Sequence, residues 1–349
     1  MEPADYKWFK FRNAKKSAMG WFSFWLIVGI TFAGISSCQN DSPKEKGMVT
    51  RWPNGAFIKY EHNPILQPTS GFESKSVYNP AVIVEDGRFS MLYRAEGEDT
   101  GAGAIGLAFS EDGIHFERYA NNPVMVREYD YEKEGVEDPR IVKFGDTYYL
   151  TYTGVGEQTS GNICLATSKD LIEWDKKGSI LQPRSDAWNS RQIKAGAIVP
   201  EKIDGKYIMY LQGEAEAWKT RVGIAYSDDL IHWREPLHEP IMRPRSGYFD
   251  SKGTEPGAAV VLEEGILLIY NGWNEELVHK TGWVIFSKEN PAEILARCEA
   301  PILESTEDWE GHILFTESIV EHQGTWYLHY GIMDKVIGVA TYEGTINHE

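Results

Sequence analysis

The chain has 349 residues, a formal net charge of −17 at pH 7, and 12 tryptophans and 18 tyrosines. So acidic a protein is a poor partner for nucleic acid or for another polyanion. Most of the aromatic rings are expected in the core, but aromatic faces also stack on sugar rings, so the composition favours carbohydrate as the ligand.

Residues 1–37 are predicted to be a secretory signal. A basic start with five Lys and Arg precedes an apolar run over about residues 21–33. The segment closes on Ser36-Ser37-Cys38, which resembles a bacterial lipobox and implies that Cys38 becomes the lipidated first residue of the mature protein. An uncleaved membrane anchor is the alternative interpretation.

The rest of the chain divides by composition into a tether and one folded domain. Residues 38–50 are interpreted as a flexible tether, and residues 51–349 as a single domain. We therefore expect an exported protein that a lipid anchors at the bacterial cell envelope, at the periplasmic or outer-membrane surface. Loss of the signal, which carries five Lys and Arg and two Asp and Glu, changes the net charge from −17 to −20.

A short apolar phrase returns five times along this domain, and a strand that ends in tyrosine lies between successive copies. The tyrosines, at Tyr93, Tyr152, Tyr210, Tyr270 and Tyr330, are spaced by 59, 58, 60 and 60 residues. Regular all-β units of about 60 residues are typical of propeller blades. The sequence therefore predicts an all-β, five-bladed β-propeller rather than a β-sandwich with accidental repetition. The copies of the phrase are Pro64-Ile65-Leu66, Pro123-Val124-Met125, Ser179-Ile180-Leu181, Pro240-Ile241-Met242 and Pro301-Ile302-Leu303.

The second repeat shows the predicted order of elements within one blade. Residues 140–144 contain β-branched side chains, Gly145-Asp146 is a turn pair, and residues 147–152 alternate like a half-buried strand. A third strand over residues 163–166 and a turn over residues 168–171 complete the pattern.

The two ends of the domain are expected to meet and close the ring. The last repeat stops soon after residues 337–340 without the outer strand of the others, and an additional strand over residues 56–60 precedes the first repeat. We expect this N-terminal strand to complete the last blade, which leaves only short sheet edges exposed.

Polar residues stand where the innermost strands begin and where the tyrosine strands end. In a propeller these positions approach the central axis, so their side chains are expected to converge on one pocket. Carboxylates brought together in this way favour acid–base chemistry, because neighbours push their pKa values apart. A solvated channel with structural salt bridges is the alternative. The positions are Asn79, Asp138, Lys194, Glu255 and Glu317 at the strand starts, and Arg94, Glu214, Asn271 and Asp334 at the strand ends.

Several segments of the chain resemble glycoside hydrolase family 130, which comprises mannoside phosphorylases and β-mannosidases. The most specific of them is Glu137-Asp138-Pro139-Arg140 in its context. The resemblance extends over roughly residues 55–343 and implies a five-bladed propeller, in agreement with the count of repeats. The matching segments include Tyr78-Asn79-Pro80-Ala81-Val82, Tyr93-Arg94-Ala95, residues 135–141, residues 166–171 with Trp174, and residues 200–207.

The resemblance also helps to choose between the family's two reaction types. Similar phosphorylases place a His-Arg pair after the tyrosine strand of the third blade to hold phosphate, whereas this chain has Gln212-Gly213-Glu214 there. In the fourth blade it has Glu255, where phosphorylases are rich in glycine and proline. Both departures match the family's hydrolases of β-1,2-linked mannosides. We therefore expect an exported, inverting, exo-acting glycoside hydrolase that acts on mannan or N-glycan-derived oligosaccharides.

The resemblance implies a role for each candidate residue. Asp138 would be the general acid, with its proton relayed through a hydroxyl of the mannose. Glu214 and Glu255 would deprotonate and orient the attacking water, and the division of these roles is left open. Direct attack by water inverts the anomeric centre. The residues expected to bind the sugar are Asn79, Arg94, Arg140, Lys194, Asn271 and Asp334.

Other functions remain open at this stage. One is a phosphorylase of the same family that holds phosphate with Arg191, Lys194 and Arg140, and another is a non-catalytic propeller that binds glycans. A relative acting on arabinosides or xylosides is a further alternative, although Asn79 stands where such enzymes place a basic aspartate.

No cofactor and no metal ion is expected, because the sequence lacks the calcium-loop, Cys-x-x-Cys and phosphate-loop motifs. No spacing argument pairs Cys164 with Cys298. The histidines His62, His115 and His232 fall in predicted loops or turns, so they are expected at the surface rather than in a metal site.

Overall fold

The computed structural model describes residues 57–98, 101–156 and 159–343, all within the predicted domain. The predicted signal, Cys38 and the tether lie outside the described residues. None of the helices in the described ranges is long and apolar enough to cross a membrane. These helices are the short 3-10 helices η1 (Gly71–Glu73), η2 (Asp130–Glu132) and η3 (Asp308–Glu310).

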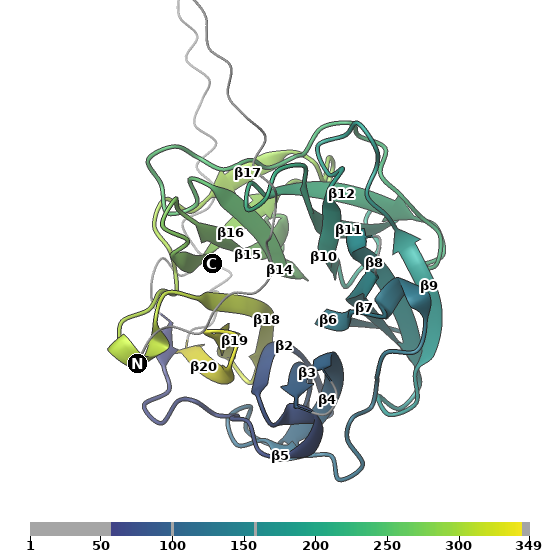
Figure 1. The fold of residues 1–349 in the computed structure, drawn as a ribbon. Coiled ribbons are helices and arrows are strands. Elements are labelled where there is room, and N and C mark those ends of the chain that lie inside the picture. Colours follow the sequence, from purple (N-terminus) through teal and green to yellow (C-terminus); the bar gives the residue numbers. More distant parts are fainter. Residues whose placement is uncertain (1–56, 99–100, 157–158, 344–349) are drawn as a thin grey trace, which may run out of the picture. The chain divides into compact units, whose positions relative to one another are not determined.

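Five four-stranded antiparallel sheets surround a common axis, which confirms the all-β, five-bladed β-propeller (Figure 1). The innermost strands contact one another in the cyclic order β2, β6, β10, β14, β18 and back to β2. The first three blades are β2 (Ser76–Glu85), β3 (Arg88–Gly97), β4 (Gly101–Ser110) and β5 (Glu117–Arg118); β6 (Gly135–Phe144), β7 (Thr147–Gly156), β8 (Thr159–Ser168) and β9 (Asp175–Leu181); and β10 (Gln192–Ile198), β11 (Tyr207–Glu214), β12 (Arg221–Ser227) and β13 (Trp233–Arg234). The last two are β14 (Gly253–Val261), β15 (Ile266–Trp273), β16 (His279–Phe286) and β17 (Ile294–Arg297); and β18 (Leu314–His322), β19 (Thr325–Ile332), β20 (Val336–Glu343) and β1 (Ile58–Lys59).

The N-terminal strand closes the ring as predicted. β1 pairs antiparallel with β20, with Ile58 opposite Thr341 and Lys59 opposite Ala340. The backbone N–H of Tyr60 continues the contact by donating to the carbonyl of Val339 at 3.0 Å. The last blade is therefore built from both ends of the domain.

The repeated apolar phrase lies at the outer edge of each blade, beside the third strand. Its last residue is buried in every copy and pairs with the third strand of a blade, as Met125 does with Ile105 and Met242 with Val222. Burial of such side chains stabilises each blade by roughly 1.5–3 kcal/mol per residue. The buried residues are Leu66, Met125, Leu181, Met242 and Leu303.

The prediction that the second strands end at the tyrosines was wrong. β3 continues from Tyr93 to Gly97, β7 from Tyr152 to Gly156 and β11 from Tyr210 to Glu214. Polar residues soon follow Tyr93, Tyr152, Tyr210 and Tyr270, which usually signals a strand end, but here each strand continues through them. Arg94, Glu214 and Asn271 consequently lie within strands rather than after them.

Three blades contain what we call a peripheral triad, in which a buried carboxylate binds a tyrosine hydroxyl and a cation. Tyr93 Oη donates to Glu73 Oε2 at 2.8 Å, and Arg118 Nε lies 2.6 Å from Glu73 Oε1. The carboxylate stands just before the innermost strand, the tyrosine in the second strand and the cation in the outermost strand, so each triad ties one blade together. The triads are Glu73–Tyr93–Arg118, Glu132–Tyr152–Lys176 and Asp250–Tyr270–Arg297.

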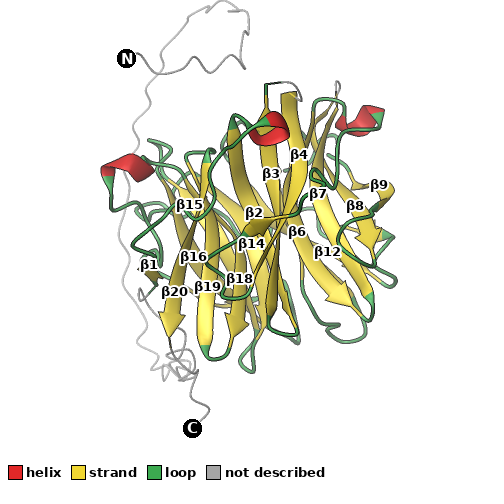
Figure 2. Ribbon diagram, turned by 90° about the horizontal axis from the view of Figure 1, so that it is seen from below, coloured by secondary structure: helices red, strands yellow, loops and turns green. Residues whose placement is uncertain are grey.

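The other two blades depart from this pattern. In the last blade Glu310 binds Lys59 of β1 at 2.6 Å, while Tyr330 Oη accepts a hydrogen bond from Asn63. In the third blade Asn189 replaces the carboxylate and donates to Glu235. The side view in Figure 2 shows the short helices at one end of the ring, the end from which the innermost strands start.

Candidate functional site

All five innermost strands have a register shift near their start, and these bulges build the site. A β-bulge turns an additional residue out of the ladder. In three strands a proline follows the candidate residue, as in Asn79-Pro80, Asp138-Pro139 and Glu255-Pro256, and proline cannot donate to the ladder. Asn79 (φ 51°) and Asp138 (φ 50°) adopt the left-handed conformation that asparagine and aspartate tolerate better than most residues.

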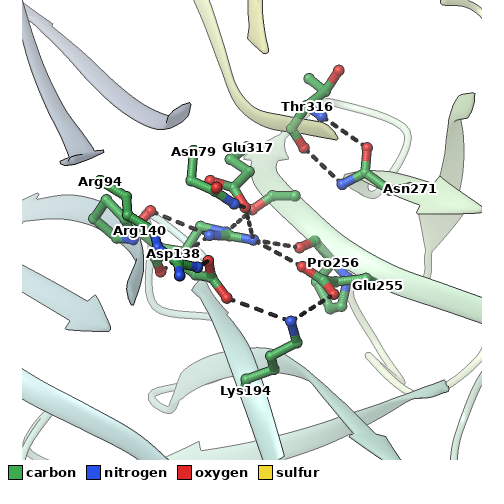
Figure 3. Close-up of polar contacts among 12 residues, drawn as sticks. Asn79, Arg94, Asp138, Arg140, Lys194, Glu255, Pro256, Asn271, Thr316 and Glu317 are labelled. Carbon is green, nitrogen blue, oxygen red and sulfur yellow. Dashed lines mark hydrogen bonds and ion pairs between the residues drawn. The ribbon is translucent and has the colours of Figure 1, made fainter. Parts of the chain in front are cut away.

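Asp138 lies at the centre of a buried charge network (Figure 3). Its side chain is 3% exposed, with Oδ1 3.4 Å from Arg94 Nη1 and Oδ2 3.5 Å from Lys194 Nζ. Lys194 also lies 3.7 Å from Glu255 Oε2, so its ammonium bridges Asp138 and Glu255. Two candidate catalytic carboxylates, predicted from separate blades, therefore meet at one cation.

Arg140 holds the backbone next to Asp138 and Glu255 in place. Its Nε and Nη2 donate to the backbone carbonyls of Gly257 and Pro256, at 2.8 and 3.1 Å, and its Nη1 donates to the carbonyls of Asp138 and Pro139. Nη2 also lies 3.1 Å from Glu317 Oε1. Because its donors are taken up by three blades, we assign Arg140 a positioning role instead of the predicted contact with sugar.

Glu317 belongs to the site, although the sequence analysis placed it at the axis without giving it a role. It is 2% exposed, pairs with Arg140 and accepts a hydrogen bond from Asn79 Nδ2. Its Oε2 has no hydrogen-bond partner among the described residues. The sequence pointed to Glu317 because it occupies the same position in its innermost strand as the other four polar residues at the strand starts.

A second group of charges surrounds Arg94. Its Nη2 binds Glu96 at 2.8 Å and Glu137 at 2.9 Å, and its guanidinium lies 4.7 Å from the ring centroid of Tyr78. Asp334, in the turn after β19, interacts electrostatically with Arg94 and Asp138. Arg94, Lys194, Asn79 and Asp334 thus lie around Asp138 as predicted, and Glu96 and Glu137 join them.

Glu214 is 1% exposed but makes different contacts. Arg191 binds its Oε1, and the backbone N–H of Trp218 donates to its Oε2 at 2.9 Å. It pairs in register with Gln192, two residues before Lys194 on the neighbouring strand. With both oxygens engaged, Glu214 is better suited to orienting a group than to taking up a proton.

Asn271 has a structural role rather than the predicted contact with sugar. Its Nδ2 donates to the Thr316 carbonyl at 3.0 Å, and its Oδ1 accepts from the Thr316 N–H at 2.8 Å. Figure 3 shows this pair to one side of the charge network. The two bonds join β15 to β18, so the amide is committed to holding adjacent blades together.

We call the charged residues around the axis the axial cluster. Seven carboxyl groups in it share four cations, so every cation has at least one carboxyl group beside it. In the described part of the chain no group of three or more His, Cys, Asp or Glu is arranged to hold a metal ion. The carboxyl groups are Glu96, Glu137, Asp138, Glu214, Glu255, Glu317 and Asp334, and the cations are Arg94, Arg140, Arg191 and Lys194.

The environment drives the acidities of Asp138 and Glu255 apart. Burial raises the pKa of Asp138, but Lys194, Arg94 and Arg140 outweigh it and hold that pKa below its usual value. Burial raises the pKa of Glu255, and the charge of Asp138 adds to this effect against the attraction of Lys194. Opposite shifts in neighbouring carboxyl groups are typical of an acid–base pair.

Glu317 is the other proton-holding group of the cluster. Burial raises its pKa to about 8, and the charges of Asp138 and Glu255 act in the same direction against Arg140. Burial likewise raises the pKa of Glu137 and of Asp334. With a pKa of about 8, Glu317 keeps its proton in the free protein at neutral pH.

A cavity of about 250 Å³ continues along the axis beyond Arg140. Its walls are mostly apolar side chains of the innermost strands, including Val142, Ile198 and Ile319, with Arg140 and Glu317 among its lining residues. Asp138 and Lys194 do not line it. Arg140 thus stands at the boundary between the charged site and an apolar part of the axis.

The remaining cysteines and histidines lie away from this site. Cys164 and Cys298 are free and buried, one in β8 and the other after β17. The side chains of His62, His115 and His232 are largely exposed, as predicted.

The chain was compared with known families and proteins. The model of glycoside hydrolase family 130, described as β-1,4-mannooligosaccharide phosphorylase, matches residues 57–347. A 1,2-β-oligomannan phosphorylase of Thermoanaerobacter sp. (strain X514) is 37% identical over 299 residues, which cover 80% of this chain and 95% of that protein. A β-1,2-mannobiose phosphorylase of the same organism is 36% identical over 310 residues, covering 82% and 97%.

A solved structure gives a different indication of reaction type. It is described as coming from the family 130 glycoside hydrolases that target β-1,2 mannosidic linkages in Candida mannan. It is 30% identical to this chain with a TM-score of 0.74, and the match covers 85% of this chain and 96% of that one. Proteins similar to this chain thus include both reaction types.

Proposed function

The chain belongs to glycoside hydrolase family 130, and we propose that it is an exported enzyme that hydrolyses β-mannosidic bonds, with β-1,2 linkages as the main target. The observation that carries the choice of water over phosphate is the pairing of charges in the axial cluster. Each cation that could hold phosphate already binds a carboxylate: Arg191 binds Glu214, and Lys194 binds Asp138 and Glu255. Because these cations are already paired, a phosphate dianion would have to displace a carboxylate, whereas a carboxylate beside them can polarise a water molecule.

The second candidate is a phosphorylase acting on the same linkage. The relatives at 37% and 36% identity are phosphorylases, which favours this reaction. Phosphate would have to displace Glu214 from Arg191 or the two carboxylates from Lys194. Release of a sugar phosphate outside the cytoplasm would also be wasteful, which links the reaction type to the predicted export signal.

In the proposed reaction, water attacks C1 of the mannose as the bond between C1 and the leaving oxygen breaks. Asp138 gives a proton to the leaving oxygen, as the family resemblance implies, and Glu255 takes one from the water, while Glu214 orients that water. One water is consumed, and attack from the opposite face inverts the anomeric centre.

The pKa directions favour the protonation state that follows a turnover rather than the one that starts it. After one turnover Asp138 is ionised and Glu255 is protonated, which is the state that the opposite pKa shifts favour in the free protein. A proton must therefore return to Asp138 before the next turnover. Asn79, Arg94, Lys194 and Asp334 are proposed to bind the mannose hydroxyls, and Arg140 to fix the carboxylates.

We also propose that the protein is exported and anchored through Cys38. The support is the sequence pattern of residues 1–38, with its basic start, apolar run and terminal cysteine. Mass spectrometry of the protein extracted from cells is expected to find a lipidated Cys38 at the N-terminus. A Cys38→Ala variant is expected to lose the lipid, and a mature chain that still begins at Met1 would contradict the proposal.

The reaction type is tested by anomer-resolved proton NMR of β-1,2-mannobiose incubated with the protein, with and without phosphate. We expect free α-mannose to appear first in phosphate-free buffer, with no increase in rate on adding phosphate. Mannose 1-phosphate formed only with phosphate would establish the second candidate. The absence of any product in both samples would contradict the proposed substrate.

A further inference from the structure

We propose that Trp218 forms an aromatic platform that binds the mannosyl residue on the leaving-group side of the cleaved bond. The inference rests on the proposed function, because it names a subsite of the same enzyme. Trp218 lies in the turn after β11, four residues beyond Glu214.

The backbone of Trp218 is held in an unfavourable conformation. Its φ is 66°, in the left-handed region that glycine and asparagine adopt readily and bulky residues rarely do. Such a conformation costs on the order of 1–3 kcal/mol and persists only where its surroundings fix it. An observed outlier of this kind points to a functional constraint on the residue.

Two hydrogen bonds provide that fixation. The N–H of Trp218 donates to Glu214 Oε2 at 2.9 Å, and its carbonyl accepts from Trp273 Nε1 at 3.0 Å. Trp273 is itself 2% exposed and packs against His279. The base of the Trp218 side chain is therefore held beside a candidate catalytic carboxylate by a buried part of the neighbouring blade.

The indole itself remains accessible, since Trp218 is 48% exposed. Asp138, Glu255 and Glu317 are 2–3% exposed, so the sugar that they contact must enter the axis. In an exo-acting enzyme that sugar is the terminal mannose, and the rest of the chain projects outward. Trp218 contacts Glu214 through its backbone N–H and is exposed, so it is suited to the outward sugar rather than to the cleaved one.

The chemistry of the ring fits a sugar ligand. The C–H groups of a pyranose face pack on an aromatic ring, while its hydroxyls need polar partners at the edges. The ion pair of Glu214 with Arg191 adjoins the Trp218 backbone and brings polar groups to this place. A rigid aromatic surface binds at low entropic cost, because few rotatable bonds are fixed when the ligand arrives.

The protein provides a matched comparison for Trp218. Trp309 is equally exposed, at 48%, and lies in η3 at the same end of the ring. Among the hydrogen bonds described for the axial cluster, none involves Trp309. A general effect of removing an exposed indole can therefore be separated from an effect at the site.

The test measures sugar binding by calorimetry in an Asp138→Asn background, in which bound substrate is not consumed. We expect Trp218→Ala to weaken the binding of β-1,2-mannobiose at least tenfold, while mannose, which contacts only the axial cluster, binds as before. Trp218→Phe is expected to restore most of the affinity, and Trp309→Ala to have no effect. Thermal unfolding of each variant verifies that it is folded.

The outcomes separate this inference from the proposed function. Equal affinity of the Trp218→Ala and parent proteins for the disaccharide would overturn the platform and leave the proposed function intact. Equal losses of affinity for mannose and mannobiose would also overturn it, because they would indicate a disturbed axial cluster. Failure of the parent to bind mannobiose at all would overturn both.

Discussion

The peripheral triads and the axial cluster contain the same groups, buried carboxylates beside cations, but they balance charge differently. In a peripheral triad such as Glu132–Tyr152–Lys176, one carboxylate meets a hydroxyl and a cation, and its hydrogen-bonding capacity is used. In the axial cluster seven carboxyl groups share four cations. Asp138 Oδ2 and Glu317 Oε2 have no hydrogen-bond partner within the described ranges.

The peripheral triads therefore stabilise the blades, whereas the axial cluster is arranged to bind a ligand or water. A buried polar atom without a hydrogen bond costs roughly 1–3 kcal/mol, so such atoms persist where a ligand or water completes them. The triads fasten the outermost strand of a blade to its tyrosine, and stability gained there offsets the cost at the axis.

The largest expected effect is on the rate after Asp138→Asn. The variant removes one partner of the acid–base pair, and we expect kcat on β-1,2-mannobiose to fall by about 10²–10⁴-fold. The loss of stability should be smaller than in a peripheral triad. Neutralising Asp138 removes its attraction to Lys194 and Arg94, but it also relieves its repulsion of the neighbouring carboxyl groups. Steady-state kinetics and urea unfolding check the two parts. A folded variant with unchanged kcat would remove Asp138 from the mechanism.

The opposite response is expected from Glu132→Gln in a peripheral triad. Removing one partner of a buried ion pair costs about 3–5 kcal/mol, and Lys176 is left with only the more distant, exposed carboxylate of Glu128. Urea unfolding should report this loss, while kcat of the folded protein stays near that of the parent. Glu128→Gln is the control, because Glu128 lies 4.0 Å from the same lysine but is 61% exposed. A loss of kcat without a loss of stability in Glu132→Gln would contradict the separate roles assigned to the peripheral triads and the axial cluster.

The smallest effect is a change in the pH dependence of stability after Glu317→Gln. The pKa of Glu317 is about 8 in the folded protein and about 4.3 in an unfolded chain. Between these values the folded state holds a proton that the unfolded state has lost, so this group makes stability fall as pH rises. The variant lacks that group, and its urea midpoint should fall less than the parent's between pH 5 and pH 8.5.

A control and a contradicting result complete this comparison. Glu276→Gln removes a carboxylate from the surface and should leave the parent's pH dependence in place. Identical slopes for Glu317→Gln and the parent would show that Glu317 does not carry the proton assigned to it.

The sequence located much of the site but not the roles within it. Asn79, Asp138, Lys194, Glu255 and Glu317 were recognised as equivalent strand starts, because a repeat places equivalent residues at equivalent distances from the axis. Arg140 and Asn271 were assigned to sugar binding, yet their polar atoms are bound to backbone groups of other blades. No local pattern reveals which partner a polar side chain meets 45 or 117 positions away along the chain.

The sequence by itself determined the number of blades, their order and the closure of the ring. These features depend on local periodicity and on repeats of about 60 residues, both of which can be read along the chain. The tertiary structure alone decided which charges share a cation, as Asp138 and Glu255 share Lys194. It also decided which residues are buried without partners and where Trp218 is held. The physical reason is that pKa values and hydrogen bonds depend on distances of a few ångströms between blades, and these distances are fixed only when the ring closes.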